Sequence, residues 1–464
     1  MQFFKLFRTG LLAVAAVASL NAFAGTIDAN AARMAANSFL KQKAATGMLK
    51  AASTADIKLA YTEKSSVSGN AFYVFNIDGG GWVIVAGDDR AKQILAYGDK
   101  GNLDMNDLPG NMKDYLQLYK NQIEEMQSYK GEVVAIKALN RSSVVEPLTK
   151  SIWGQSNPFN RQCPQLSDGY PPVGCGPLAM AQIIYYWKYP ENLPALDSYY
   201  IYQSWMTVPE LPAATLDFSQ LVDAYTAWND AGQLTLLPTT DEQKAEVAKL
   251  CRYCAQSCLT RFASGGSGSY TYDQRDGFGK MGFQSDYKLY GIDPSYYCDN
   301  SSKLTQEQWT ELIRAELEAG RPIAYHNVDF VDGHAWVLDG IDADNKFHMN
   351  WGWYEKCNGW FEFGAFTVAP SGETWNFNGS GNEMVINLYP YDGYVIPGDE
   401  PQGMRGDVNN SGDVSIADVT ALIDYLLSGD ASAISLDNAD CNLDSNVSIA
   451  DVTKLIDYLL SGNW

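Results

Sequence analysis

The chain has 464 residues, is 46% hydrophobic and carries a formal net charge of -22. That length suits several domains of about 150 residues each, and the composition allows buried cores. The acidic excess argues against a nucleic-acid partner, because Lys and Arg are needed to displace the counterions of phosphates.

The first 24 residues predict a secretory signal peptide. Lys5 and Arg8 precede a short apolar run, and a small-x-small pattern ends at Ala24, as signal peptidase requires. The run is shorter than the roughly 20 residues that span a bilayer. We therefore expect a secreted chain (extracellular, cell-surface or periplasmic) with no transmembrane anchor after maturation.

Residues 25–145 predict a first domain with both helices and strands. Apolar residues recur at helical spacing in two stretches, and a turn at Asp78-Gly79-Gly80 separates two runs of strand character. The predicted elements are helices at 31–43 and 112–130 and strands at 71–75 and 81–86. Residues 141–150 lack a strong period and predict a connector.

Residues 146–390 predict a larger domain rich in Trp, Tyr and Gly, and residues 391–405, rich in Pro and Gly, predict a linker. In the larger domain Cys175 stands directly before a predicted helix. Pro177 suits a first helical turn, and apolar residues recur at helical spacing from Leu178 onward. The helix dipole and the unpaired N–H groups there favour a thiolate, the form a nucleophilic cysteine needs. Taken alone, this element fits a buried structural cysteine equally well.

A second motif, GHAWVLDG at 333–340 and KFHMNWGW at 346–353, predicts a hairpin. Symmetric pairing about Asp342 places His334 opposite Asn350. An amide would then lie beside an imidazole and orient it, as in a Cys–His–Asn site.

Only three histidines occur, at 326, 334 and 348, so a histidine base must be one of them. Strand alternation alone does not choose between His334 and His348. The alternative for His348 is a structural histidine with satisfied hydrogen bonds.

Cys251, Cys254 and Cys258 have a spacing that metal sites also use. The same spacing puts them on one face of a helix, and no histidine lies nearby. We favour buried thiols there over a zinc site.

The strings GCGPLAMAQIIYYW, GHAWVLDG and FHMNWGW resemble the active-site motifs of the streptopain family of cysteine proteases. Most of residues 25–390 is similar, including AFYVFNIDGGGWVIVAGDDRAKQILAYG, which resembles the inhibitory prodomain of that family. The resemblance implies an α+β chain: a papain-like protease domain (146–390) behind an α+β prodomain (25–145). It also implies a zymogen that is activated by a cut between about residues 140 and 150.

The resemblance further implies roles for single residues. Cys175 would be the nucleophile and His334 the general base and acid. Asn350, shielded by Trp351, would orient His334, and Gln155 would contribute to the oxyanion hole. Ser267 and Gly333 would line the peptide groove. The resemblance also suggests an apolar preference at P2, the second substrate residue before the scissile bond. For Gln155 a surface loop, and for Ser267 a flexible loop, is the alternative.

The C-terminal residues 406–464 contain a duplication, since GDVNNSGDVSIADVTALIDYLL at 406–427 recurs 33 residues further along as ADCNLDSNVSIADVTKLIDYLL. Each copy offers oxygen ligands at calcium-loop spacing, followed by a helix. The module resembles type I dockerin, a small all-α calcium-binding module that docks to cohesin domains, although Ser445 replaces the turn glycine of the second loop. The expected Ca²⁺ ligands are Asp407, Asn409, Ser411, Asp413 and Asp418 in the first loop, and Asp440, Asn442, Asp444, Asn446 and Asp451 in the second.

The preferred hypothesis is a secreted zymogen endopeptidase that docks through its C-terminal module to a cohesin-like partner and needs no cofactor for catalysis. Two alternatives stay open at this point. One is a catalytically silent scaffold that acts through the dockerin-like module. The other is a non-proteolytic acyltransferase, such as a transglutaminase-like enzyme, that uses the same trio.

Overall fold

A computed structural model describes most of the chain after the expected signal peptide, which lies outside the described residues together with most of the predicted linker. None of the helices in the described part is long and apolar enough to cross a membrane. The described residues are 25–45, 56–129, 133–134, 144–229, 233–289, 306–327, 333–364, 367–368, 381–391, 405–409, 411, 414–431, 434–442 and 447–461.

The chain forms two compact units, residues 1–388 and 389–464. Within the first unit, the N-terminal region (residues 25–129) contains both predicted helices and both predicted strands. Its elements are α1 (Ala29–Ala45), β1 (Ile57–Lys64), β2 (Asn70–Ile77), β3 (Trp82–Ala86), β4 (Ile94–Gly98) and α2 (Gly110–Ser128).

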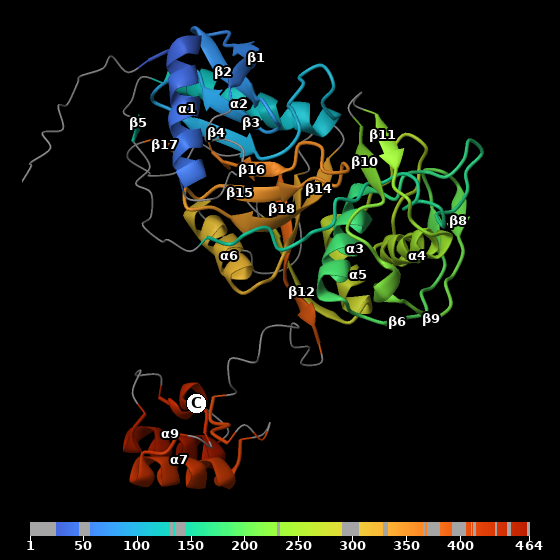
Figure 1. The fold of residues 1–464 in the computed structure, drawn as a ribbon. Coiled ribbons are helices and arrows are strands. Elements are labelled where there is room, and N and C mark those ends of the chain that lie inside the picture. The colour runs from blue at the N-terminus through green and yellow to red at the C-terminus, as the bar shows by residue number, and fades with distance from the viewer. Residues whose placement is uncertain are drawn as a thin grey trace, which may run out of the picture. The chain divides into compact units, whose positions relative to one another are not determined.

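The N-terminal region shares one sheet with the rest of the first unit. The ten strands run in the order β1-β2-β3-β4-β16-β15-β14-β13-β18-β12. Tyr97 and Ala96 of β4 pair with Trp360 and Phe361 of β16, so strands far apart in sequence lie side by side (Figure 1). The central strands are β12 (Phe283–Leu289), β13 (Ile323–Asn327), β14 (His334–Ile341), β15 (Phe347–Asn350), β16 (Gly359–Phe361) and β18 (Asn382–Pro390).

Helices and short hairpins complete the first unit. Helix α3, which carries Cys175, contacts β13 and β14 as well as α4 and α5, and α3, α4 and α5 group together in Figure 1. The helices are α3 (Cys175–Trp187), α4 (Asp241–Ser257), α5 (Thr271–Lys280), α6 (Gln306–Glu318) and the 3-10 turn η1 (Phe218–Gln220). The short strands are β5 (Val133–Val134), β6 (Asn192–Leu193), β7 (Tyr199–Ile201), β8 (Met206–Val208), β9 (Ala214–Thr215), β10 (Thr226–Trp228), β11 (Leu234–Leu236) and β17 (Thr367–Val368).

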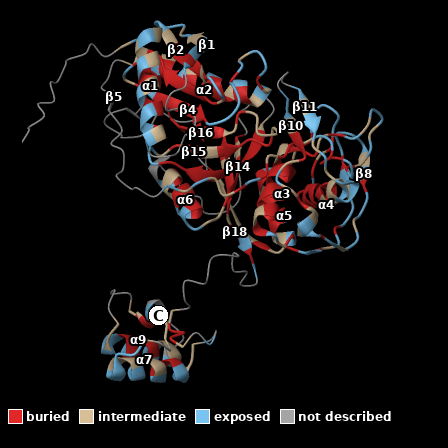
Figure 2. Ribbon diagram, viewed as in Figure 1, coloured by how far each residue is buried: buried red, intermediate tan, exposed pale blue. Residues whose placement is uncertain are grey.

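Buried residues follow the shared sheet across the boundary between the two regions (Figure 2). One apolar cluster contains Tyr115 and Met112 of α2 together with Trp336 of β14 and Phe361 of β16. Burial of this apolar area is the main term that holds the regions together.

The hairpin at 334–350 is present, but the predicted register is wrong. Asn350 pairs with Val337, and Phe347 pairs with Ile341, with an irregularity between Leu338 and Gly340. His334 instead lies opposite Asn327 of β13. The turn is centred beyond Asp342, and a bulge shifts the pairing. The strands are therefore not paired symmetrically about Asp342.

The C-terminal unit contains α7 (Ile416–Ser428), α8 (Leu436–Ala439) and α9 (Ile449–Ser461). Helices α7 and α9 lie side by side (Figure 1). Its core consists of buried residues from both sequence copies: Val408, Val419, Leu422, Ala439, Cys441, Val452 and Leu455. As a consequence, neither copy buries its apolar face alone.

Candidate active site

Cys175 is the first residue of α3, as predicted, and it is half-buried. The preceding Gly174 has φ of +102°, and a Cβ there would meet the carbonyl oxygen of Ser267 at 2.9 Å. Only glycine adopts this conformation without strain and lets the 267 loop approach so closely. Ser267, expected in the peptide groove, therefore lies beside the nucleophile candidate.

The thiol of Cys175 is not poised as a thiolate in this structure, contrary to the expectation from its helix position. Burial raises its pKa, although the backbone N–H groups of Ala335 and Gly176 hydrogen-bond to the sulfur and act in the opposite direction. Desolvation of a charged sulfur here outweighs the favourable dipoles.

His334 is fully buried and turned toward a group of tryptophans. Its Nε2–H donates to the carbonyl oxygen of Trp351 at 3.0 Å, and its ring stacks on Trp353 with centroids 4.7 Å apart. Burial lowers the pKa of His334 to about 3, against the effect of the Trp351 carbonyl. Among the hydrogen bonds of the described residues, none joins His334 to Cys175. Both groups are therefore neutral in this form.

Asn350 is close to His334 in the sequence, but its side chain hydrogen-bonds to other residues. Its Nδ2 donates to the carbonyl of Ser151 at 2.7 Å and to Gln182 Oε1 at 3.2 Å. Its Oδ1 accepts from the backbone N–H of Gly352 at 3.3 Å. In this form the acceptor that orients His334 is thus the Trp351 carbonyl, not the Asn350 amide. The contacts with Ser151 and Gln182 could not be predicted from the sequence, because they join distant segments that no local motif connects.

The other two histidines have separate surroundings. His348 Nδ1 lies 2.6 Å from Asp339 Oδ1, and Asp339 also accepts from the backbone N–H of Thr149 at 3.0 Å. His348 therefore fits the alternative given for it above, a structural histidine with satisfied hydrogen bonds. His326 of β13 contacts Thr271 and Glu383 on the opposite side of β14 from the tryptophans.

Gln155 and Gly333 flank the same site. The carbonyl of Gln155 accepts from the N–H of Val173 at 2.9 Å, which fixes its loop next to the loop of the cysteine. Gly333 has φ of +60°, and its carbonyl accepts from Asn111 Nδ2 of α2 at 3.2 Å. Three segments that are distant in sequence therefore converge around Cys175 and His334.

The N-terminal region covers this site directly. Tyr115 of α2 packs edge-on against Trp351 with ring centroids 5.3 Å apart, and its hydroxyl donates to the carbonyl of Glu362 at 3.0 Å. Together with the Asn111 contact, this packing holds the tryptophan whose carbonyl engages His334.

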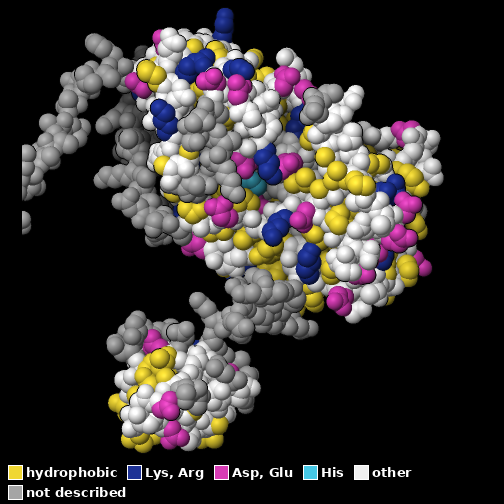
Figure 3. Space-filling model, viewed as in Figure 1, with side chains coloured by type: hydrophobic (Ala, Val, Ile, Leu, Met, Phe, Trp, Pro, Cys, Tyr) yellow, Lys and Arg dark blue, Asp and Glu magenta, His cyan; other side chains and the backbone are white. Residues whose placement is uncertain are grey.

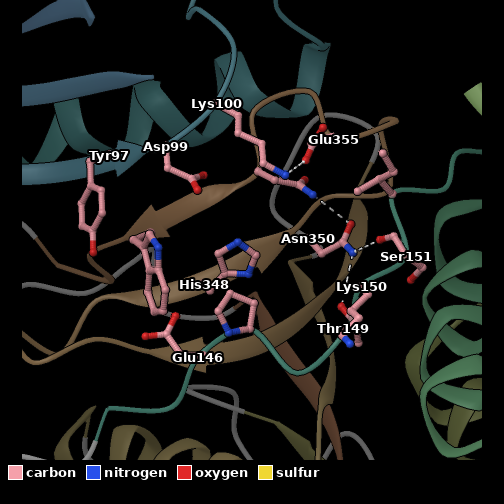
Figure 4. A pocket seen from close by; sticks show the side chains of 14 residues that line it. Tyr97, Asp99, Lys100, Glu146, Thr149, Lys150, Ser151, His348, Asn350 and Glu355 are labelled. Carbon is pink, nitrogen blue, oxygen red and sulfur yellow. Dashed lines mark hydrogen bonds and ion pairs between the residues drawn. The ribbon is translucent and has the colours of Figure 1, made fainter. Parts of the chain in front are cut away.

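A polar cavity of about 320 Å³ lies where the N-terminal region meets Asn350 and His348 (Figure 4). Lys100 from the end of β4 forms an ion pair with Glu355 across it. The lining residues are Tyr97, Asp99, Lys100, Glu146, Pro147, Thr149, Lys150, Ser151, Ile152, His348, Asn350, Glu355, Asn358 and Trp360. The N-terminal region thus also reaches the side of the site where Asn350 is held.

The predicted connector is attached to the central sheet. Val145 exchanges two backbone hydrogen bonds with Ile341 of β14, each 2.9 Å long, and the N–H of Leu148 donates to the carbonyl of Asp339. Residues 145–149 therefore run along β14 as an extended segment with one bridge, between Val145 and Ile341.

The first loop of the C-terminal unit is curled around its carboxylates. Asp407 Oδ1 accepts from the N–H of Ser411 at 2.8 Å, and Asp418 Oδ1 accepts from the N–H of Asn409 at 3.0 Å. Asp418 is fully buried, which is unfavourable for a carboxylate without a cationic partner.

The second loop repeats this pattern. The N–H of Asn442 donates to Asp451 Oδ1 at 3.0 Å, and Asp451 is fully buried. Asp413, Asp444 and Asn446 lie outside the described residues, as do the turn positions 412 and 445. Within the described residues, no three His, Cys, Asp or Glu side chains gather as a metal site. The oxygen-rich loops nonetheless have the donor chemistry that Ca²⁺ prefers.

Cys251, Cys254 and Cys258 are all buried on or just after α4. Burial raises the pKa of each thiol. These are the properties expected of buried apolar thiols.

Three family models match the chain in succession. The Spi protease inhibitor model matches residues 24–123, the peptidase C10 family model residues 153–361, and the dockerin type I model residues 405–460. The chain is 28% identical over 374 residues to streptopain of Streptococcus pyogenes serotype M28, covering 75% of this chain and 88% of that protein.

It is also 26% identical over 386 residues to the thiol protease/hemagglutinin PrtT of Porphyromonas gingivalis, covering 79% of this chain and 42% of that protein. Among solved structures, a fragment of Prevotella intermedia prointerpain A matches with a TM-score of 0.55 at 21% identity, covering 72% of this chain and 99% of that fragment. This likeness supports a fold that includes both the N-terminal and the central regions.

Proposed function

This chain is a cysteine protease of the streptopain (peptidase C10) family with a prodomain and a dockerin module, and we propose that Cys175 is its nucleophile and His334 its general base. The matches leave the non-proteolytic alternatives without support. The observation that carries the assignment is the position of Cys175 at the start of α3, hydrogen-bonded to the backbone N–H of Ala335, the residue that follows His334.

In the proposed reaction, the Cys175 thiolate attacks the scissile carbonyl carbon and forms a tetrahedral oxyanion. The Cys175 backbone N–H and the Gln155 amide would stabilise this oxyanion, and removing one such donor costs roughly 3 kcal/mol. His334 then protonates the leaving amine as the C–N bond breaks. Water, deprotonated by His334, hydrolyses the acyl-enzyme and restores the thiol. Asn350 would orient His334 in the active form, shielded by Trp351.

We propose that the prodomain keeps this pair silent. The packing of α2 on Trp351 favours the conformation in which His334 bonds the Trp351 carbonyl rather than facing Cys175. A neutral thiol and a neutral, buried imidazole are inactive as a nucleophile and base. Removal of residues 25 to about 144 would free His334.

The activation cut would fall before Val145, which narrows the expected interval of 140–150. Residues 145–149 are hydrogen-bonded to β14 of the protease domain, and Thr149 is buried against Asp339. A protease needs a segment that can leave its neighbours; Lys150 is exposed, but the residues directly before it are hydrogen-bonded to β14 and Asp339.

The C-terminal module would bind calcium through its two loops and dock the enzyme to a cohesin-like partner. Repeated apolar residues stay exposed at matching positions, such as Ile416 and Ile449 (71% and 70% exposed) and Leu427 and Leu460 (82% each). Hydrophobic side chains are visible on the surface of this unit (Figure 3). Exposed apolar residues on paired helices suit a protein partner. We also propose secretion through the N-terminal signal.

The test is maturation of the purified precursor. Cys175→Ala should remain at full secreted length, whereas wild type should shorten itself to a product that begins at or shortly before Val145 and hydrolyses casein under reducing conditions. Cys163→Ala, which alters another buried thiol of the same unit, is the matched control and should mature. Self-maturation of purified Cys175→Ala would refute the nucleophile assignment.

A further inference from the structure

Three neighbouring strands present a polar pair on the face of the sheet next to Cys175. His326 of β13 lies opposite Ala335 of β14 on one side and opposite Glu383 of β18 on the other. Side chains of directly opposed residues point to the same face. The adjacent Tyr325 and Asn327 are fully buried toward the other face, in keeping with strand alternation.

His326 is held in place by two further groups. Its Nδ1 lies 2.6 Å from Thr271 Oγ1 at the start of α5 and 3.6 Å from Glu383 Oε2. Thr271 is fully buried, so its hydroxyl is a fixed partner. Since Nδ1 is engaged, Nε2 is the ring atom left for another group, and no described residue hydrogen-bonds to it.

Nε2 lies next to Gly333, which the family resemblance places in the peptide groove. It lies 3.3 Å from the position that a Cβ on Gly333 would take. Gly333 also contacts the prodomain, because its carbonyl oxygen accepts a hydrogen bond from Asn111 of α2. Ala335, directly opposite His326, donates its N–H to the Cys175 sulfur. His326 therefore lies on the strand beside the stretch of β14 that runs past the nucleophile.

Within this pair, the carboxyl group of Glu383 favours its charged form. Burial acts to raise the pKa of Glu383, but hydrogen bonds and charge from His326, together with Thr271 and Tyr287, hold that pKa below its usual value. With the prodomain in place, the His326 side chain is 11% and the Glu383 side chain 15% exposed. A carboxylate at this depth fixes the imidazole and favours a polar ligand on its far side.

We propose that His326, anchored by Thr271 and Glu383, is a specificity-determining residue. It gives this protease a preference for a hydrogen-bonding side chain at P2, the second substrate residue before the scissile bond. This rests on the proposed function of Cys175 and His334. It replaces the apolar preference that the family resemblance implies. The reason is that burying an apolar side chain against an unsatisfied Nε2 leaves a polar group without a partner, whereas a hydroxyl or amide satisfies it.

The experiment compares two peptide substrates that differ only in Thr or Val at P2, a pair of nearly equal shape. The readout is the ratio of kcat/KM for Thr to that for Val, measured with the mature enzyme after titration of active sites with an epoxide thiol reagent. His326→Leu should lower this ratio about tenfold, the worth of one hydrogen bond. His326→Gln, which keeps a hydrogen-bonding group, should retain most of it.

Thr271→Val provides a second route, because it removes the hydroxyl that fixes Nδ1 with almost no change of shape. It should lower the same ratio even if His326→Leu fails to mature. An unchanged ratio in Thr271→Val, or in a matured His326→Leu, overturns this inference alone, since the protease still works. Wild-type enzyme that cleaves neither peptide nor casein overturns the proposed function as well.

Discussion

The prodomain and the dockerin module are stabilised by different kinds of contact. The prodomain extends the sheet of the protease domain through the β4–β16 pairing and shares its apolar cluster. The dockerin module has its own core, built from two copies of one short sequence. The prodomain therefore depends on residues distant in the chain, and its removal must break the shared sheet. The module depends mainly on neighbouring residues and on loops suited to calcium.

Buried ion pairs make the prodomain junction specific. Lys43 of α1 lies 2.8 Å from Asp342 and 3.0 Å from Asp344, and Lys43 and Asp342 are almost completely buried. The hydroxyl of Tyr97 also donates to Asp342 at 2.8 Å. A buried carboxylate tolerates this position because several donors compensate its lost hydration.

The largest effect is expected from Lys43→Met. Removing the lysine leaves Asp342 buried with fewer partners, so the precursor should lose about 3 kcal/mol or more of unfolding free energy. Urea unfolding of the Cys175→Ala precursor measures this loss without interference from maturation. Lys58→Met, which removes an exposed ion pair with Asp78, is the control and should have little effect. Equal losses in both variants would show that the buried pair does not hold the junction.

Acid should remove the same contribution. Although burial favours the neutral acid, Lys346 and Lys43 hold the pKa of Asp342 below its usual value. A carboxylate whose pKa is lowered on folding stabilises the fold above its unfolded pKa of about 3.9 and loses that effect as pH falls through the lower folded value.

The measurement is the stability difference between the Cys175→Ala precursor and its Lys43→Met variant as a function of pH. The difference should be constant from neutral pH down to about 4 and should shrink below that. A difference that persists unchanged in stronger acid would mean that packing of the lysine stem, not its charge, carries the effect.

Calcium should affect the other region and leave the junction alone. In the full-length Cys175→Ala chain, calcium at about 100 times its Kd should stabilise the dockerin module by about 2.7 kcal/mol. Excess chelator should lower one melting transition in a calorimetric scan and leave the transition of the prodomain and protease domains in place. Asp451→Ala should weaken the response, since Asp451 is a buried carboxylate of the second loop. A chelator that shifts both transitions, or neither, contradicts this separation.

Much of the fold was predictable because its signals are local. The helix that begins at Cys175, the helices at 29–45 and 110–128, and the strands around the turn at 78–80 follow from residue periodicity and turn residues. The duplication of residues 406–427 likewise predicted a module with two similar helices, now α7 and α9. The family motifs located the pair of Cys175 and His334.

The details of the site were not predictable in the same way. The hairpin register failed because a bulge near Leu338 and a displaced turn moved Asn350 away from His334. The hydrogen bond from His334 to the Trp351 carbonyl depends on the packing of α2 against Trp351. No pattern of spacing in the sequence encodes such a contact.

The sequence by itself therefore determined the order of the three parts, the nature of their main elements and the identity of the nucleophile and base candidates, because periodicity, turn chemistry and motifs act over a few residues. The tertiary structure alone decided that β4 and β16 share a sheet, that His334 hydrogen-bonds to the Trp351 carbonyl in this form, and that His326 meets Glu383 next to Gly333. Those outcomes depend on which distant segments pack together, and that is set by the burial of the whole apolar core rather than by any local preference.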